Sequence, residues 1–115
     1  MAVDRDNNDL TDLYQPHHPA VLGMIARVSQ AAEKAGIWVG VCGEAGGDSL
    51  LSPFFAALGI KELSMAPGSL PKVRQALAKL TFDAVERQTL VDTVLDCSTA
   101  AEVIEQLNKL DWIKT

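Results

Sequence analysis

The sequence has few cysteines and no cluster of basic residues, and each shortage excludes a class of protein. Its two cysteines, Cys42 and Cys97, are too far apart to form a C-x-x-C pair, so neither a zinc site nor a dithiol redox centre is indicated. The chain has 10 Lys plus Arg against 15 Asp plus Glu, a formal net charge of −5. Nucleic acid and anionic lipid are therefore poor partners, because an acidic surface repels phosphate groups.

Long apolar runs are also missing. The longest charge-free apolar stretch, residues 49–60, is shorter than the roughly 20 residues of a membrane span and contains Pro53. The first residues, MAVDRDNNDLTD, are acidic and polar and lack the basic and apolar blocks of a signal peptide. We therefore expect a cytoplasmic protein without a membrane span or a leader.

The length and composition predict one packed segment. The chain has 115 residues, of which 48% are hydrophobic and 22% charged, as in soluble globular proteins. We treat residues 1–115 as a single segment. A complete (β/α)8 barrel needs about 250 residues, or about 200 in its smaller versions, and cannot be built from this chain alone.

The first regular elements are a helix and a buried strand. Pro19 suits the first turn of a helix and Gly36 suits its left-handed end, which predicts a helix over residues 19–35. Residues 37–42 are an apolar run typical of a parallel strand covered on both faces. The expected core face of the helix repeats at steps of three and four residues and comprises Val21, Ile25, Val28, Ala32 and Ala35.

The rest of the chain alternates helices with one more strand. The expected elements are a loop over 43–48, a helix ending near Leu58 and capped by Asp48 or Ser52, a strand over 62–65, a loop over 66–69, a helix opening at Ser69, a helix from a Thr81 cap to about Asp96, and a last helix after the capping box Thr99–Glu102. This order predicts an α/β fold. Two strands do not make a sheet, so the buried strand needs further neighbours.

The candidate chemical group is the thiol of Cys42. Cys42 ends the first predicted strand, and the loop over 43–48 follows it. Ligand sites of parallel α/β proteins form at the carboxyl ends of strands, where a thiol can donate a proton or attack an electrophile. The alternative is that Cys42 is a small buried hydrophobic residue, as most free cysteines are.

Other polar residues have simpler interpretations. Arg5 has the guanidinium that binds phosphate or carboxylate, but it lies between Asp4 and Asp6 and could form a solvated ion pair. His17 and His18 lack the spacing of a metal site, so we expect at least one of them at the surface or capping a helix.

Three further side chains are assigned to packing. Cys97 closes an amphipathic helix and is expected to pack against its neighbours. Trp38 and Trp112 are expected as anchors of the core or of an interface.

Four stretches stand out in order along the chain: Ala2-Val3-Asp4-Arg5; Leu13-Tyr14-Gln15-Pro16 with His18-Pro19-Ala20-Val21-Leu22; Val41-Cys42-Gly43-Glu44 with Gly47-Asp48; and Glu62-Leu63-Ser64-Met65 with Leu70-Pro71. Together they resemble one family, enzyme I of the bacterial sugar phosphotransferase system, in the C-terminal part of its phosphoenolpyruvate-binding barrel. The similarity covers nearly the whole chain. Pyruvate phosphate dikinase has a similar C-G-E-x-G-G-D loop and is less similar elsewhere.

The resemblance implies a fold and a reaction. The fold is the C-terminal portion of a (β/α)8 barrel, with its last two strands and their helices. In the family, phosphoenolpyruvate phosphorylates a histidine of a separate domain, which passes the phosphoryl group to the phosphocarrier HPr, and a cysteine protonates the enolpyruvate held on Mg²⁺. Cys42 falls on that cysteine and Arg5 on an arginine that binds the substrate phosphate, with Gly43 and Glu44 in support.

The resemblance also implies what this chain lacks. The phosphorylated histidine and the Mg²⁺ ligands lie upstream of the A-V-D-R stretch in the family, and this sequence starts at Met1 just before that stretch. We therefore expect the chain alone to be inactive. The alternatives are a dimerisation or assembly module without catalysis of its own, a piece of a pyruvate phosphate dikinase-like enzyme, and a redox-sensing thiol.

Overall fold

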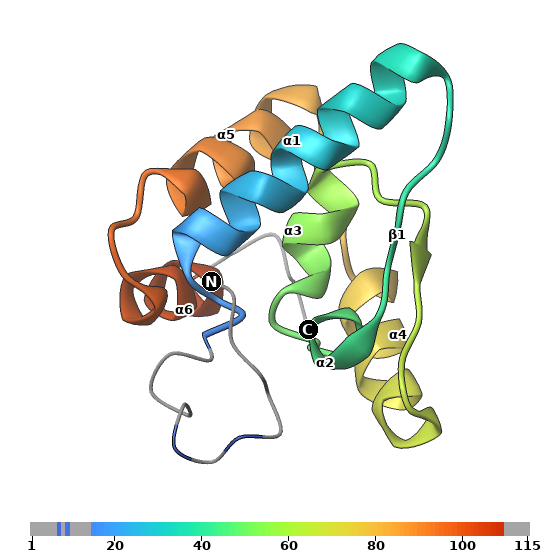
Figure 1. Ribbon diagram of the computed structural model, residues 1–115, viewed down its shortest axis with the longest axis vertical. Helices are drawn as coiled ribbons and strands as arrows, with labels where there is room; N and C mark the ends of the chain where they lie inside the picture. The colour runs from blue at the N-terminus through green and yellow to red at the C-terminus, as the bar shows by residue number, and fades with distance from the viewer. Residues whose placement is uncertain (1–6, 8, 10–14, 110–115) are drawn as a thin grey trace.

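In the computed structural model, which describes residues 7, 9 and 15–109, a small parallel sheet lies along one side of a group of helices (Figure 1). The elements, in chain order, are α1 (Pro19–Ala35), β1 (Gly40–Val41), α2 (Gly43–Gly46), α3 (Ser52–Ala57), β2 (Glu62–Leu63), the 3-10 helix η2 (Pro67–Ser69), α4 (Leu70–Ala78), α5 (Ala84–Leu95) and α6 (Ala100–Asn108). The chain is thus a helix-rich α/β structure, as the sequence predicts. None of the described helices is long and apolar enough to cross a membrane.

Helix α1 has the predicted bounds but a different buried face. His18 caps it, because its Nδ1 accepts a hydrogen bond from the Ala20 N–H at 3.0 Å, and Gly36 ends it in the left-handed region at φ 72°. The predicted core face is wrong at Val28, which is 56% exposed, and at Ala35, which is exposed. Apolar residues cover more than one side of α1, so periodicity alone did not select the buried side. The buried residues are Pro19, Leu22, Ala26, Ser29 and Ala32.

The two strands are shorter than predicted and pair with each other. Strands β1 and β2 run parallel, with Gly40 opposite Glu62 and Val41 opposite Leu63. In the described part of the chain the sheet has these two strands and no more. The expected burial of residues 37–42 on both faces is therefore wrong, because one neighbouring strand leaves the rest of the run uncovered.

The predicted loops at 43–48 and 66–69 each contain a short helix. The first loop contains α2, which immediately follows Cys42, and the second contains η2, which leads into α4. Short turns of this kind satisfy backbone groups that an irregular loop would leave to water.

Of the caps predicted for the last two helices, the one at α5 is wrong and the one at α6 is confirmed. The predicted Thr81 cap is wrong, because Asp83 caps α5 and its Oδ1 accepts a backbone N–H at 2.8 Å. The Thr99 cap of the predicted capping box is confirmed at α6, where the Thr99 hydroxyl accepts the Glu102 N–H at 3.2 Å, but the reciprocal bond goes to the residue before Thr99. The Glu102 carboxylate in turn accepts the Ser98 N–H at 2.8 Å.

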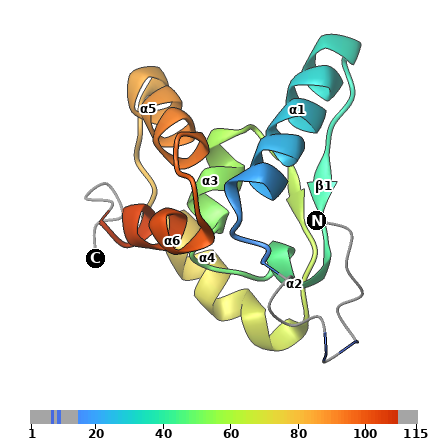
Figure 2. The ribbon, with the colours of Figure 1, turned by 60° about the vertical axis from the view of Figure 1, so that its left-hand side comes forward.

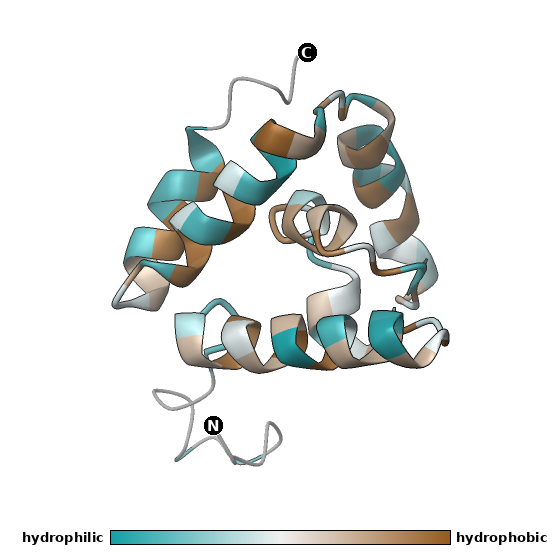
Figure 3. Cartoon of the chain, turned by 90° about the horizontal axis from the view of Figure 1, so that it is seen from above, coloured by the Kyte–Doolittle hydropathy of each residue, from teal (hydrophilic) through white to brown (hydrophobic). Residues whose placement is uncertain are grey.

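The core is built around α3, which contacts both α4 and α5 and lies between α5 and α1 in Figure 2. Figure 3 shows hydrophobic and hydrophilic residues sharing the turns of the outer helices, so that each helix has an apolar side to bury. The largest fully buried side chains are Phe54 and Phe55 of α3, with Leu22, Leu51, Leu90, Leu107, Val94 and Val103.

One close backbone approach joins α2 to the ends of both strands. A Cβ atom at Gly46 would lie 2.5 Å from the carbonyl oxygen of Ser64 and 2.8 Å from that of Val41. Both distances are shorter than van der Waals contact, and the obstructing atoms are backbone, which cannot rotate away. Glycine is therefore required at this position for α2 to lie against the sheet.

We predict that Gly46→Ala lowers the free energy of unfolding by about 1–3 kcal/mol, because α2 must move off the strand ends. The matched control is Gly68→Ala, since a Cβ at Gly68 meets nothing within 4 Å. The control variant should stay within about 0.5 kcal/mol of the parent. Urea denaturation of the three proteins measures both effects, and equal losses in the two variants would contradict the contact at Gly46.

Candidate functional site

Cys42 lies at the junction between β1 and α2, with an exposed side chain. Its backbone is extended, with φ −124° and ψ −176°, and it is the N-cap residue of α2. The predicted position at the end of a strand is confirmed. The alternative that Cys42 is a buried hydrophobic residue is wrong.

The loop after Cys42 is held against the residues that follow β2. Gly43 starts α2 at φ 76°, a left-handed conformation in which other residues are strained. A Cβ at Gly47 would lie 3.1 Å from the Cβ of Met65 and 3.2 Å from the Oγ of Ser69. The carboxyl ends of the two parallel strands therefore meet at one edge of the sheet.

A shallow cleft of about 530 Å³ lies at this edge. Cys42 directly precedes the cleft in the chain and is not one of its lining residues. Glu44, the acidic residue in the first turn of α2, lines the cleft on one side. The lining residues are Gly43, Glu44, Gly47, Ser64, Met65, Ala66 and Ser69.

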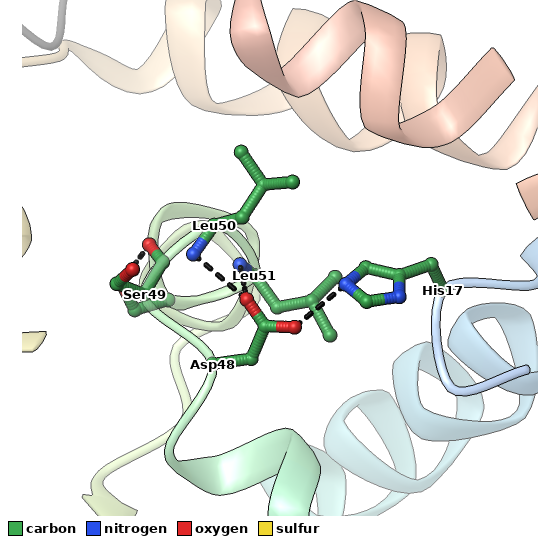
Figure 4. A network of polar contacts seen from close by, with 6 residues as sticks. His17, Asp48, Ser49, Leu50 and Leu51 are labelled. Carbon is green, nitrogen blue, oxygen red and sulfur yellow. Dashed lines mark hydrogen bonds and ion pairs between the residues drawn. The ribbon is translucent and has the colours of Figure 1, made fainter. Parts of the chain in front are cut away.

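A contact between a histidine and a carboxylate joins the turn before α1 to the end of this loop, and the sequence did not predict it. His17 Nε2 lies 2.6 Å from Asp48 Oδ2, and the two side chains are 20% and 25% exposed. Figure 4 shows the Asp48 carboxylate between the imidazole and the backbone of the following turn. The two residues are distant in sequence and belong to no shared motif, so no local signal could have paired them.

Asp48 also caps the turn that leads into α3. Its Oδ1 accepts hydrogen bonds from the N–H groups of Leu50 at 2.9 Å and Leu51 at 3.4 Å. Ser52, the other predicted cap, is the first residue of α3, and its Oγ donates to the Ser49 carbonyl at 2.8 Å. Neither predicted residue is the N-cap of α3, because that position is Leu51, which has no side-chain cap bond. Asp48 caps the preceding turn instead.

The other candidate residues from the sequence do not lie together at this site. His18 caps α1, which confirms the expected capping histidine. Trp38 is 64% exposed, so its assignment to the core is wrong, and its role in an interface stays a prediction. Arg5 and Trp112 lie outside the described residues.

Cys97 lies in a different environment from Cys42. It is partly buried against the core, which confirms the predicted packing role, and its Sγ donates to the Thr93 carbonyl at 3.3 Å. Burial raises the pKa of the Cys97 thiol, and the carboxylates of Glu102, Asp96 and Glu105 raise it further. Thiolate chemistry is therefore disfavoured at Cys97.

The described residues do not fit a metal ion. Among them, no group of three or more His, Cys, Asp or Glu side chains is placed to hold one. His17 and His18 have other partners, the carboxylate of Asp48 and the N–H of Ala20. We therefore assign no Mg²⁺ ligand to them and derive no step through the ion.

Comparison with known proteins gives a family and several relatives. The family model of the PEP-binding domain of PEP-utilising enzymes matches residues 1–82. A phosphoenolpyruvate-protein phosphotransferase from Latilactobacillus sakei is 40% identical over 107 residues, which cover 93% of this chain and 18% of the relative. The proteins of the same name from Geobacillus stearothermophilus and Bacillus subtilis are 43% and 40% identical, and each alignment covers 90% of this chain and 18% of the relative.

The match extends over both strand ends and the loop between Cys42 and Asp48. The chain spans about a fifth of the length of the curated relatives, as the shares of 18% show. It is therefore similar to one part of each relative, and that part is a phosphoenolpyruvate-binding region by the description of the family. With 82 of its 115 residues matched, the chain belongs to the family of PEP-binding domains of PEP-utilising enzymes.

Proposed function

We propose that this chain is part of a phosphoenolpyruvate-protein phosphotransferase, enzyme I, and that Cys42 is its proton donor. The observation that carries the proposal is the exposed thiol at the carboxyl end of β1, inside the region that matches the PEP-binding family. The names of the relatives favour enzyme I over a pyruvate phosphate dikinase-like enzyme.

The proposed reaction has two parts. Phosphoenolpyruvate first gives its phosphoryl group to a histidine on another part of the protein, which passes it to HPr, and enolpyruvate remains. The S–H of Cys42 then gives its proton to the methylene carbon, while the electron pair of the enolate forms the carbonyl of pyruvate. The thiolate recovers a proton from water. Arg5 binds the phosphate, because a guanidinium neutralises a phosphoryl group with two parallel hydrogen bonds.

Gly43 and Glu44 support the thiol in this proposal. The left-handed backbone of Gly43 turns the chain immediately after Cys42. Glu44 follows in the first turn of α2 and lines the adjoining cleft, where its carboxylate orients the thiol or a water that carries the proton. The Mg²⁺ that serves the family is bound, on this proposal, by residues outside this chain.

The decisive experiment is a chimera in which this chain replaces the matching segment of the B. subtilis relative. We expect the chimera to convert phosphoenolpyruvate to pyruvate, and Cys42→Ala to slow that conversion by about 100-fold or more, since the acid is lost. Cys97→Ala is the matched control and should leave the rate unchanged. The 115-residue chain alone should show no phosphoryl transfer, because the proposed acceptor histidine lies outside it.

Two results would contradict this proposal. A normal rate in the Cys42→Ala chimera would exclude Cys42 as the acid. Magnesium-dependent phosphoryl transfer by the pure chain would contradict the proposal that the phosphoryl acceptor lies outside this chain.

The proton-donor role requires an accessible Cys42 thiol, and the two cysteines offer an internal comparison. We predict that iodoacetamide at pH 7.5 alkylates Cys42 faster than Cys97, because Cys42 is exposed and the pKa of Cys97 is raised. Raising the pH should accelerate the reaction of Cys97, since more of its thiol ionises. Intact-mass measurements on Cys42→Ser and Cys97→Ser report each rate separately, and equal rates in the two variants at pH 7.5 would refute the difference in environment.

A second candidate function, an assembly or dimerisation module, is favoured by the apolar surface before β1. Ile37 and Trp38 are 66% and 64% exposed, and Met24 and Val28 of α1 are also exposed. The strands β1 and β2 pair with each other and with no further strand in the part of the chain that is described. Free strand edges next to exposed apolar side chains favour association.

We predict that the isolated chain forms oligomers at micromolar concentration, observed by native mass spectrometry. Trp38→Ser should reduce the oligomeric fraction, because it removes the largest exposed apolar side chain. Val85→Ser is the control, since Val85 is an apolar residue that is 74% exposed and belongs to α5. A monomer in all three proteins would argue against the assembly function.

A further inference from the structure

The turn before α1 directs His17 away from its own helix. The N–H of His18 donates to the carbonyl of Gln15 at 3.0 Å, which closes a turn with His17 inside it. The side chain of His17 then points to Asp48, as Figure 4 shows. The neighbouring His18 does the opposite and caps α1 itself.

The Asp48 carboxylate contacts two parts of the chain, the turn before α1 and the turn that leads into α3. One oxygen lies 2.6 Å from His17 Nε2, and the other accepts the N–H of Leu50 at 2.9 Å. About three quarters or more of each partner's side chain is shielded from water. Partial shielding strengthens such a contact relative to a fully exposed ion pair, since screening by solvent is weaker.

Asp48 is in turn fixed to the helix that begins after Cys42. The N–H of Asp48 donates to the Ala45 carbonyl at 3.2 Å, and the N–H of Gly47 donates to the Glu44 carbonyl at 3.2 Å. These bonds tie Asp48, which follows the C-cap residue Gly47, to the end of α2. A shift of the Asp48 backbone would therefore move the end of α2, whose N-cap residue is Cys42.

We propose that His17 is a positioning residue that fixes the loop over residues 43–48, and through it the Cys42 thiol, by holding the Asp48 carboxylate. The contact fastens the turn over residues 15–18 to the strand-end edge of the sheet. The effect on proton donation rests on the proposed function of Cys42. The coupling between His17 and the loop does not depend on that function.

The adjacent histidines provide a matched pair of variants. His17→Ala removes the contact with Asp48, and His18→Ala removes the cap of α1 without touching the loop. His17→Gln keeps a side-chain N–H that can donate to the carboxylate, so it should rescue the effect of His17→Ala. Each variant is made in the 115-residue chain.

The first measurement is a double-mutant cycle by urea denaturation. We expect His17→Ala and Asp48→Ala to be coupled by about fivefold in the unfolding equilibrium constant, as residues in direct contact are. The cycle of His18→Ala with Asp48→Ala should be additive. Additive losses in the His17 cycle would overturn the proposal.

The second measurement is amide hydrogen exchange at Gly47 and Asp48, whose N–H groups hold the loop together. We expect exchange at these two amides to rise by about tenfold in His17→Ala, since the loop opens locally more often, and to return toward the parent rate in His17→Gln. Exchange in α5 should change far less. Equal exchange at the loop in His17→Ala and His18→Ala would overturn a local role. If Asp48→Ala does not fold, the exchange of the three histidine variants still decides the proposal.

The same variants separate this proposal from the proposed function. In the chimera, His17→Ala should lower kcat more than it raises KM. The substitution misplaces the proposed proton donor, but it does not alter the residues that are proposed to bind the phosphate. If Cys42→Ala has no effect on turnover while the His17 cycle shows coupling, the proton-donor function is wrong and the positioning of the loop stands. If Cys42→Ala abolishes turnover while His17→Ala leaves kcat and loop exchange unchanged, the proposal about His17 is wrong.

Discussion

The contact of α2 with the ends of both strands is the constraint on which the site depends. Parallel strands end at the same edge of a sheet, and here the backbone of Gly46 lies so close to the carbonyls of Val41 and Ser64 that no side chain fits between them. This contact sets the direction in which the chain leaves β1. It thereby places Cys42 at the edge, exposed to solvent, rather than in the core. The cleft beside α2 and the position of Asp48 both follow from it.

The sequence predicted the helices well because their signals are local. Pro19 and Gly36 bound α1, and the Thr99 cap bounds α6, each through hydrogen bonds or dihedral angles within a few residues. The strands were predicted too long, because strand length depends on partners. Ile37 and Trp38 have the apolar character of a buried strand, yet they are exposed, and among the described residues no second strand covers them.

Some features of the candidate site were likewise predicted from local sequence signals, whereas others depend on contacts between distant residues. Cys42 was predicted as a candidate because it follows an apolar run typical of a strand. The family of the chain was predicted from four motifs in order. Both signals are contained in the sequence itself. The pairing of His17 with Asp48 could not be found, since it depends on how α1 and the loop after β1 come together. The same applies to the cleft, which is lined from two segments that meet at the sheet edge. The place of Arg5 lies outside the described residues, so its role stays a prediction.

The loop after Cys42 is fixed by contacts that this chain supplies itself. Gly46 lies against both strand ends, Asp48 caps the turn before α3, and His17 holds Asp48 from the other side. A proton donor benefits from such a scaffold, because a group held in place before substrate binds loses less entropy in the reaction. Phosphoryl transfer, by contrast, requires an acceptor and charged groups that the proposed function assigns to other parts of a longer protein. The two halves of the proposed reaction therefore place different demands on the fold. On that proposal, the position of Cys42 is set by contacts within this chain, whereas the phosphoryl acceptor is assigned to other parts of the protein.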